Sequence, residues 1–206
     1  MLISHRSKFI FIHIYKTAGT SITKALRPFA DNAWKLRVAA LIKRLGIRLG
    51  AQPYPDHISA ADLIAEIGRE RFDSYFSFAF VRNPWDWQAS FYTFVRKTRH
   101  HAHYNLLKSL GSFDNYIRWR SKQYVGFQKD FIFSAQGEQL VDYVGRYERV
   151  EEDFKYICDR LGIVAGLPRL NVSRSMPYQD YYNEETKELV RQTFAADIAL
   201  FNYSFD

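Results

Sequence analysis

Two apolar stretches that pass directly into polar residues dominate the hydrophobic pattern of this chain. Phe9–Ile14 and Tyr75–Val81 are rich in aromatic and β-branched residues, which predicts buried strands. A helical pattern over Ser21–Leu26 follows the first stretch, and a second helical pattern begins after Asn83. Each strand is therefore expected to end in a short turn that leads into the N-terminus of a helix.

The rest of the pattern alternates helices with one further strand. Helices are expected over Trp34–Leu49, Ser59–Glu70, Glu151–Leu161 and Glu184–Leu200, a strand over Leu140–Tyr147, and a loop over Gly166–Tyr178. No internal repeat and no linker divides the 206 residues. This alternation predicts a single α/β domain, residues 1–206, with a small central parallel sheet flanked by helices.

Composition adds that the chain is globular and suits anionic partners. Hydrophobic residues make up 47% and aromatic residues 17%, so the chain is not disordered. The 29 basic and 22 acidic residues give a formal charge of +7. A polyanionic nucleotide, an acidic glycan, nucleic acid and a membrane surface would all fit this charge, so charge alone does not choose among them.

The single cysteine and the absence of long apolar runs bear on location. Cys158 has no partner for an intramolecular disulfide and excludes a cysteine-based zinc site, and its apolar helical neighbourhood predicts a buried structural thiol. No window approaches about twenty apolar residues, so neither a transmembrane segment nor a signal peptide is expected. The low cysteine content favours a cytoplasmic protein.

The turn after the first strand carries a lysine, a glycine and three hydroxyl residues in the order Lys16-Thr17-Ala18-Gly19-Thr20-Ser21. Amides at the helix N-terminus, the helix dipole, the lysine charge and the hydroxyls would together favour an anion, and Gly19 would let the backbone approach it closely. A turn with a capping threonine or serine is the simpler alternative. A Walker-type ATP loop is disfavoured. In a Walker loop the lysine follows the second glycine, whereas Lys16 precedes Gly19, and the first glycine of the Walker pattern is missing in this sequence.

A second anion site is expected where the strand Tyr75–Val81 ends. Asn83 can cap the following helix and Asp86 suits the dipole at its N-terminus. Arg82 then lies at the carboxyl tip of the strand, with Ser90 about two turns into the helix, so one anion could contact both side chains. A solvated arginine at a strand end is the alternative.

In combination, these motifs resemble those of the sulfotransferase family. Residues 16–21 resemble the 5'-phosphosulfate loop, and Arg82-Asn83-Pro84-Trp85-Asp86 with Ser90 is similar to the 3'-phosphate motif. The resemblance spans Phe9 to the end of the chain. It implies a P-loop-like three-layer α/β fold and the donor 3'-phosphoadenosine 5'-phosphosulfate (PAPS), with no metal required. Tyr15 stands where relatives usually have proline, and Trp87 where they often have arginine.

The resemblance also implies an acceptor and roles for residues. It is nearest to the heparan and chondroitin uronosyl branch, so a neutral or anionic glycan is the expected acceptor, with no nucleic acid and no stable membrane insertion. Lys16 would stabilise charge on the oxygen that bridges sulfur and phosphorus, and His57 would be the general base. An exposed loop histidine is the alternative for His57. Ser173 and Arg174 would contact the donor.

Other histidines are not needed for this chemistry. His13 alternates with Phe9 and Phe11 along the first strand and is expected to be structural. His100, His101 and His103 are expected to form a polar loop after a helix and not a metal cluster.

Two other classes of function stay open. A kinase or another P-loop phosphotransferase would place a magnesium-binding carboxylate after a strand, and none follows the strand tips in this sequence. A basic binding protein on an inactive nucleotide fold would have lost Lys16 or Arg82, and both are present. Within the sulfotransferases, a tyrosine or small-molecule acceptor also stays open.

Overall fold

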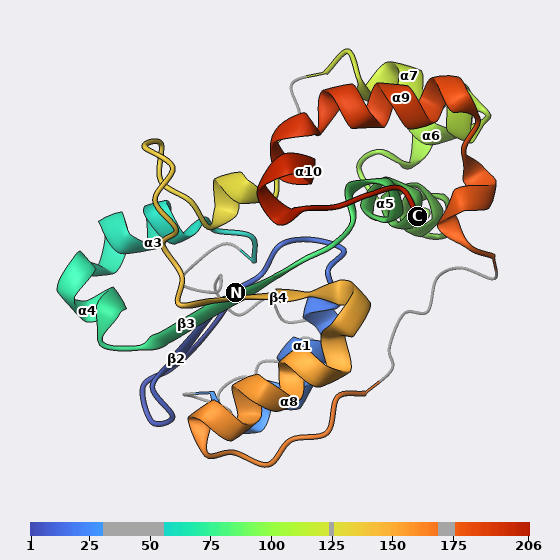
Figure 1. Ribbon diagram of the computed structural model, residues 1–206. Helices are drawn as coiled ribbons and strands as arrows, with labels where there is room; N and C mark the ends of the chain where they lie inside the picture. The colour runs from blue at the N-terminus through green and yellow to red at the C-terminus, as the bar shows by residue number, and fades with distance from the viewer. Residues whose placement is uncertain (31–55, 124–125, 169–175) are drawn as a thin grey trace. The chain divides into compact units, whose positions relative to one another are not determined.

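The computed structural model describes residues 1–30, 56–123, 126–168 and 176–206. The chain forms two compact units: unit 1 is Met1–Val81 with Phe131–Leu170, and unit 2 is Arg82–Asp130 with Asn171–Asp206 (Figure 1). The helix expected over residues 34–49 and the donor contacts expected at Ser173 and Arg174 lie outside the described residues.

Unit 1 is built on a four-stranded sheet with the strand order β1-β2-β3-β4. The strands are β1 (Leu2–Ser4), β2 (Phe9–Ile12), β3 (Phe76–Val81) and β4 (Tyr143–Arg146). β2, β3 and β4 run parallel, whereas β1 pairs antiparallel with β2. The expected parallel sheet is confirmed, and β1 is an addition that three residues were too few to reveal as a pattern.

Helices cover this sheet on both sides. They are α1 (Gly19–Leu26), α3 (Ala60–Ile67), α4 (Arg69–Asp73) and α8 (Val150–Leu161), with the 3-10 turns η1 (Arg27–Phe29) and η3 (Tyr147–Arg149). Figure 1 shows α1 and α8 on one side of the sheet and α3 and α4 on the other. The three-layer α/β fold expected from the sequence is confirmed.

Alternate strand residues form the core under α1 and α8. Phenylalanines of β2 and β3 pack against apolar residues of the two helices, namely Phe9, Phe11, Phe78 and Phe80 against Ile22, Leu26, Phe154 and Ile157. Cys158 is buried in the same cluster and forms no disulfide, and burial raises the pKa of its thiol. The interpretation as a structural thiol fits this placement.

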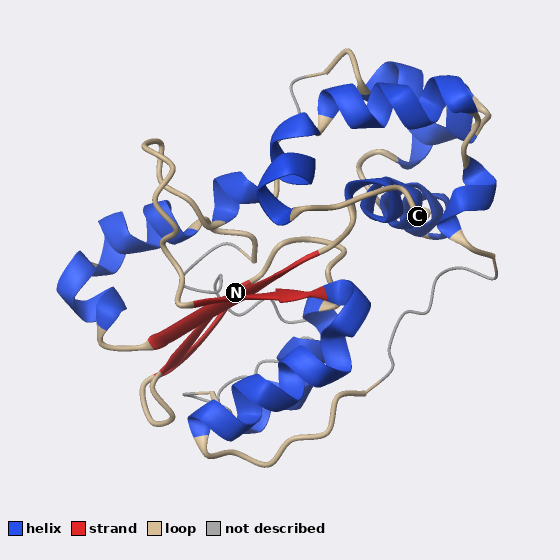
Figure 2. Cartoon of the chain, in the orientation of Figure 1, coloured by secondary structure: helices blue, strands red, loops and turns tan. Residues whose placement is uncertain are grey.

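Unit 2 contains helices and no strand in its described part (Figure 2). Its elements are α5 (Pro84–Lys97), α6 (Tyr104–Leu110), α7 (Phe113–Arg120), η4 (Tyr178–Tyr181), α9 (Glu184–Thr193) and α10 (Ala195–Phe201), and η2 (Lys129–Phe131) begins at its edge. The cap expected for α5 is confirmed, because the Asn83 side chain accepts a hydrogen bond of 3.1 Å from the Trp85 amide.

Two expected helices are each divided into two. The first ends at Gly68, whose φ of 87° favours glycine and starts α4 in a new direction. The last is interrupted at Phe194, whose ring packs edge-on against the buried Trp87 with 5.8 Å between the ring centroids. The first break therefore falls at a glycine, a residue of low helix propensity, and the second at a residue that packs in the core.

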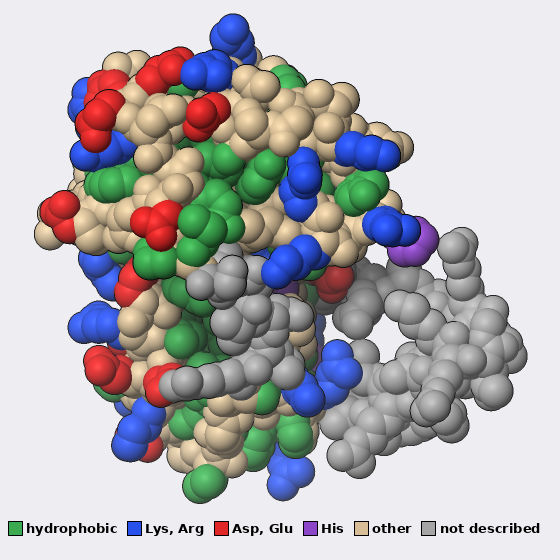
Figure 3. Space-filling view, turned by 90° about the vertical axis from the view of Figure 1, so that its right-hand side faces the viewer, with side chains coloured by type: hydrophobic (Ala, Val, Ile, Leu, Met, Phe, Trp, Pro, Cys, Tyr) green, Lys and Arg blue, Asp and Glu red, His purple; other side chains and the backbone are tan. Residues whose placement is uncertain are grey.

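The surface carries charges of both signs. Lys and Arg side chains occur across the face drawn in Figure 3, with Asp and Glu among them, so the positive charge on that face is not confined to one patch. Within the described ranges, no helix is both long enough and apolar enough to cross a membrane.

Candidate functional site

The loop between β2 and α1 has a strained backbone. Lys16 and Ala18 have φ angles of 64° and 67°, in the left-handed region that residues with a side chain seldom adopt. The Ala18 carbonyl accepts hydrogen bonds from the amides of Ser21 and Ile22, and no side chain caps α1. An uncapped helix N-terminus presents amide donors and a partial positive charge, which is the arrangement that binds anions.

Gly19 has a packing role in addition to the close approach to an anion that the sequence predicts. Its φ is not in the left-handed region, but a Cβ atom at this position would lie 1.8 Å from Nε2 of His13. The missing side chain makes room for the His13 imidazole, which also stacks on Phe11 with 5.7 Å between ring centroids. Gly19 therefore joins the start of α1 to the end of β2 by close packing.

Replacing Gly19 with alanine is expected to destabilise the protein by about 1–3 kcal/mol, the usual cost of overpacking. The added methyl would displace the His13 ring, which Phe11 and His57 hold on other sides. Urea denaturation measures the effect, and Gly126→Ala is the matched control, since its Cβ would meet no atom within 4 Å. The double variant with His13→Ala should recover stability; a Gly19→Ala protein as stable as the parent would contradict this account.

The hydroxyl residues of the loop occupy different environments. Thr17 is fully buried, and its Oγ1 donates a hydrogen bond of 2.8 Å to the carbonyl of Ile14. Its proton is used within the loop, so the backbone amide is what Thr17 can offer to an anion. Ser21 is buried in the first turn of α1, whereas Thr20 is exposed.

His57 contacts the same loop from the segment before α3. Its Nδ1 donates a hydrogen bond of 2.8 Å to the carbonyl of His13, so Nε2 carries the lone pair. The rings of His57 and His13 lie 4.6 Å apart by their centroids, and the Tyr15 ring meets His57 edge-on at 6.0 Å. Unit 1 thus brings His57 to the residues immediately before Lys16.

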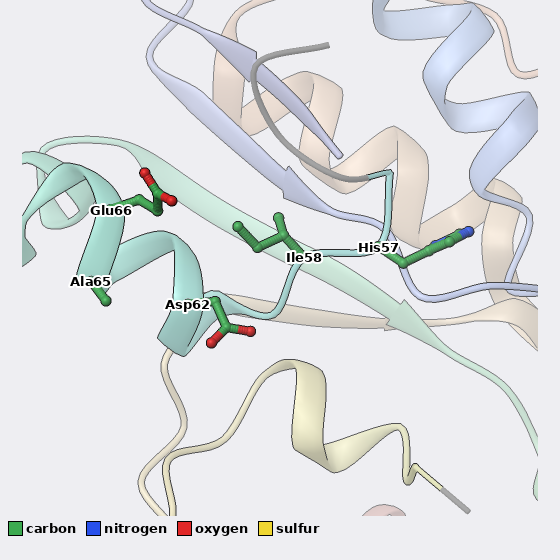
Figure 4. Close-up of a pocket in the computed structure, with 5 residues that line it drawn as sticks. All are labelled: His57, Ile58, Asp62, Ala65 and Glu66. Atoms are coloured by element: carbon green, nitrogen blue, oxygen red, sulfur yellow. The ribbon is translucent and has the colours of Figure 1, made fainter. Parts of the chain in front are cut away.

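A pocket of about 590 Å³ adjoins this histidine. Its described lining is His57, Ile58, Asp62, Ala65 and Glu66. Figure 4 shows that the His57 imidazole points away from Asp62 and Glu66, which project from α3. The ring is therefore oriented toward the residue that follows β2, whose carbonyl it contacts, and not toward the carboxylates.

His13 is neutral beside His57. Burial lowers the pKa of His13 to about 3, and the positive charges of the Met1 amine and of His57 act in the same direction. His57 therefore lies beside a neutral imidazole. The structural role expected for His13 fits its stacking on Phe11, but its contact with His57 was not foreseen.

Arg82 and Ser90 lie in unit 2, Arg82 between β3 and α5 and Ser90 within α5. The Arg82 side chain is 4% exposed, and its Nε forms an ion pair of 2.6 Å with Oδ2 of Asp86. A solvated arginine is therefore the wrong interpretation, and Asp86 has a partner that the sequence did not suggest. Ser90 is buried as well. A buried guanidinium is weakly screened by water, which strengthens its attraction for an anion.

The tyrosines of the late segment pack on the start of α5. The Tyr182 hydroxyl donates a hydrogen bond of 2.8 Å to the Trp85 carbonyl. Nδ2 of Asn83 donates one of 3.3 Å to the Tyr178 hydroxyl. These contacts tie the segment that follows Ser173 and Arg174 to the residues next to Arg82, within unit 2.

The histidines after α5 have an aromatic role. His101 and His103 lie 5.7 Å and 6.1 Å from Phe91 by ring centroids. Over the ranges that the structure describes, no group of three His, Cys, Asp or Glu side chains is placed to hold a metal ion.

Comparison with known proteins identifies the family of this chain. A model of the Sulfotransferase family matches residues 1–204, which include both strand-to-helix motifs. The chain is also similar to a protein of Archaeoglobus fulgidus named only as an uncharacterized protein, with 25% identity over 114 residues, 55% of this chain and 90% of that protein. Because the family model covers almost the whole chain, this protein belongs to the sulfotransferase family.

Proposed function

We propose that this protein transfers a sulfuryl group from PAPS to a hydroxyl group, and that the acceptor is a carbohydrate. The observation that carries the proposal lies within unit 1. There, the strained loop with Lys16, the uncapped start of α1 and the imidazole of His57 meet at the end of β2. A loop suited to an anion, with an imidazole beside it that can act as a base, supports group transfer from an anionic donor.

The 5'-phosphosulfate of the donor is assigned to the loop of residues 16–21. The amides at the N-terminus of α1 and the Lys16 ammonium supply the positive potential, and Ser21 and Thr20 supply hydroxyls. Thr17 shapes the loop through its bond to Ile14. No residue of the proposed set has to become charged during the reaction except the base.

The reaction follows from these assignments. Nε2 of His57 accepts the proton of the acceptor hydroxyl while the hydroxyl oxygen forms a bond to the sulfur of PAPS. The bond between sulfur and the 5'-phosphate oxygen breaks, and 3'-phosphoadenosine 5'-phosphate (PAP) leaves. Lys16 stabilises the negative charge that develops on that oxygen. As in phosphoryl transfer, positioning and electrostatics supply most of the rate, because a loose transition state leaves little covalent work to the protein.

The 3'-phosphate is assigned to Arg82 and Ser90. The burial of both side chains and the fixed Nε edge of Arg82 support this role, because a held guanidinium loses little freedom when it binds phosphate. The assignment makes a distinction that can be measured. Arg82 should contribute to PAP binding and not to the binding of AMP, which lacks the 3'-phosphate.

Arg82→Ala is expected to weaken PAP binding by about 10–100-fold, the range for a lost hydrogen bond to a charged group. AMP binding should change little, and kcat at saturating PAPS should fall less than the affinity. Isothermal titration with both nucleotides measures this, and Arg99→Ala, outside the motif, serves as control. Equal losses for PAP and AMP would contradict the assignment, because they would indicate general damage from unpairing the buried Asp86.

The activity is tested by incubating the protein with PAPS and one acceptor at a time: a neutral glycan, a uronate-containing glycan, a tyrosine peptide and a simple phenol. Chromatography and mass spectrometry follow PAP and the sulfated product together. We expect equal amounts of both with a glycan. Phosphate transfer from magnesium ATP to these acceptors, with no sulfated product from PAPS, would contradict the proposal. The glycan acceptor and the cytoplasmic location stay predictions from the sequence.

A further inference from the structure

A buried glutamine holds both peptide groups of Arg82. Oε1 of Gln128 accepts a hydrogen bond of 2.8 Å from the Arg82 amide, and Nε2 of Gln128 donates one of 2.8 Å to the Arg82 carbonyl. The Gln128 side chain is fully buried. One side chain thus satisfies the donor and the acceptor of a single residue, at the point where β3 has ended and α5 has not begun.

A buried carboxylate holds the glutamine in turn. Oδ2 of Asp197 accepts a hydrogen bond of 2.8 Å from the backbone amide of Gln128, and Oδ1 accepts one of 3.0 Å from the backbone amide of Lys129. Asp197 lies in the first turn of α10 and is fully buried. Burial raises the pKa of this carboxyl to about 6, which the two backbone amides oppose.

We infer that Gln128 and Asp197 are positioning residues that hold Arg82 in the orientation that binds the 3'-phosphate of the donor. This inference rests on the proposed function. The residues all belong to unit 2, and their contacts run without a gap from Asp197 through Gln128 to the Arg82 backbone. With Asp86 on Nε, the arginine is fixed at its backbone and at its side chain.

The chemistry of the network favours positioning over simple packing. Burying a carboxylate and an amide costs free energy that apolar residues of the same size would not cost. Here these buried polar groups converge on one residue, and that residue carries a charge suited to phosphate. Preorganisation of this kind raises affinity, because less conformational freedom is lost when the ligand binds.

Two variants test the inference. Gln128→Met keeps the length of the side chain and loses both bonds to Arg82, and Asp197→Asn replaces one acceptor oxygen with a donor that faces an amide. For each, we expect PAP affinity in isothermal titration to fall about five- to ten-fold, as for one or two net hydrogen bonds, and AMP affinity to stay within about two-fold. Gln123→Met, at an exposed glutamine of unit 2, is the matched control and should change neither.

A thermodynamic cycle separates positioning from structure. In the Arg82→Ala background, Gln128→Met should no longer lower PAP affinity, because the residue acts through the guanidinium. Equal losses for PAP and AMP, unchanged PAP affinity, or a full further loss in the Arg82→Ala background would each overturn the inference. If Asp197→Asn does not fold, as circular dichroism would show, Gln128→Met alone decides. If Arg82→Ala leaves the ratio of PAP to AMP affinity unchanged, the proposed donor site itself is wrong.

Discussion

Replacing His57 with alanine is expected to lower kcat for sulfuryl transfer by about 10²–10⁴-fold, the usual contribution of a general base. PAP affinity should stay unchanged, because the donor contacts proposed here do not include the imidazole. The expected loss of kcat follows from the geometry of His57, because the hydrogen bond from Nδ1 to the His13 carbonyl orients the ring and keeps the lone pair on Nε2. Steady-state kinetics with PAPS and a glycan, together with titration of PAP, measure both quantities.

The control for this variant is His100→Ala, which removes an exposed histidine from the loop after α5. It should leave both kcat and PAP affinity as they are. Added imidazole should restore part of the activity of His57→Ala, since the truncated side chain leaves space beside the existing pocket. Full activity of His57→Ala would show that another group accepts the proton, and the assignment of the base would then be wrong.

The second large effect is expected at Lys16. Lys16→Ala should lower kcat by about 10²–10³-fold, as when one group that stabilises transition-state charge is removed. PAP affinity should fall less, because the ammonium acts most strongly on charge that develops only as the bond to sulfur breaks. Alanine meets the same steric strain as lysine at a φ of 64°, so the variant removes the charge without a large change in backbone preference.

The matched control is Lys24→Ala, which removes an exposed lysine from α1. It changes the net charge by the same amount and should leave the kinetics unaltered. If Lys16→Ala weakened PAP binding and left kcat unchanged, the lysine would bind the ground state and the transition state equally, and its catalytic role would be refuted.

Local patterns in the sequence were enough to predict the elements that present the two motifs. The aromatic run before Arg82 forms β3, and Asn83 caps α5. These are properties of neighbouring residues: a run of aromatic and β-branched residues, and a side chain that reaches the next amides. The break at Gly68 had the same kind of signal, a glycine inside a helical pattern.

Contacts between distant residues could not be predicted in this way. His57 bonds to a carbonyl 44 residues earlier, and Gln128 bonds to an amide 46 residues earlier. Neither hydrogen bond can be predicted from the hydrophobic period or from the spacing of motifs in the sequence, because both depend on how the sheet and the helices pack. The reason for Gly19 is of the same kind, since the clash with His13 arises only when the end of β2 meets the start of α1.

We propose that the strained loop and Arg82 bind a sulfuryl donor and not magnesium ATP. Isothermal titration of the unmodified protein with PAP, and separately with ATP and magnesium, tests this claim most directly. We predict saturable binding of PAP and no comparable binding of ATP with magnesium over the same concentrations. Tight binding of magnesium ATP with no response to PAP would contradict the account.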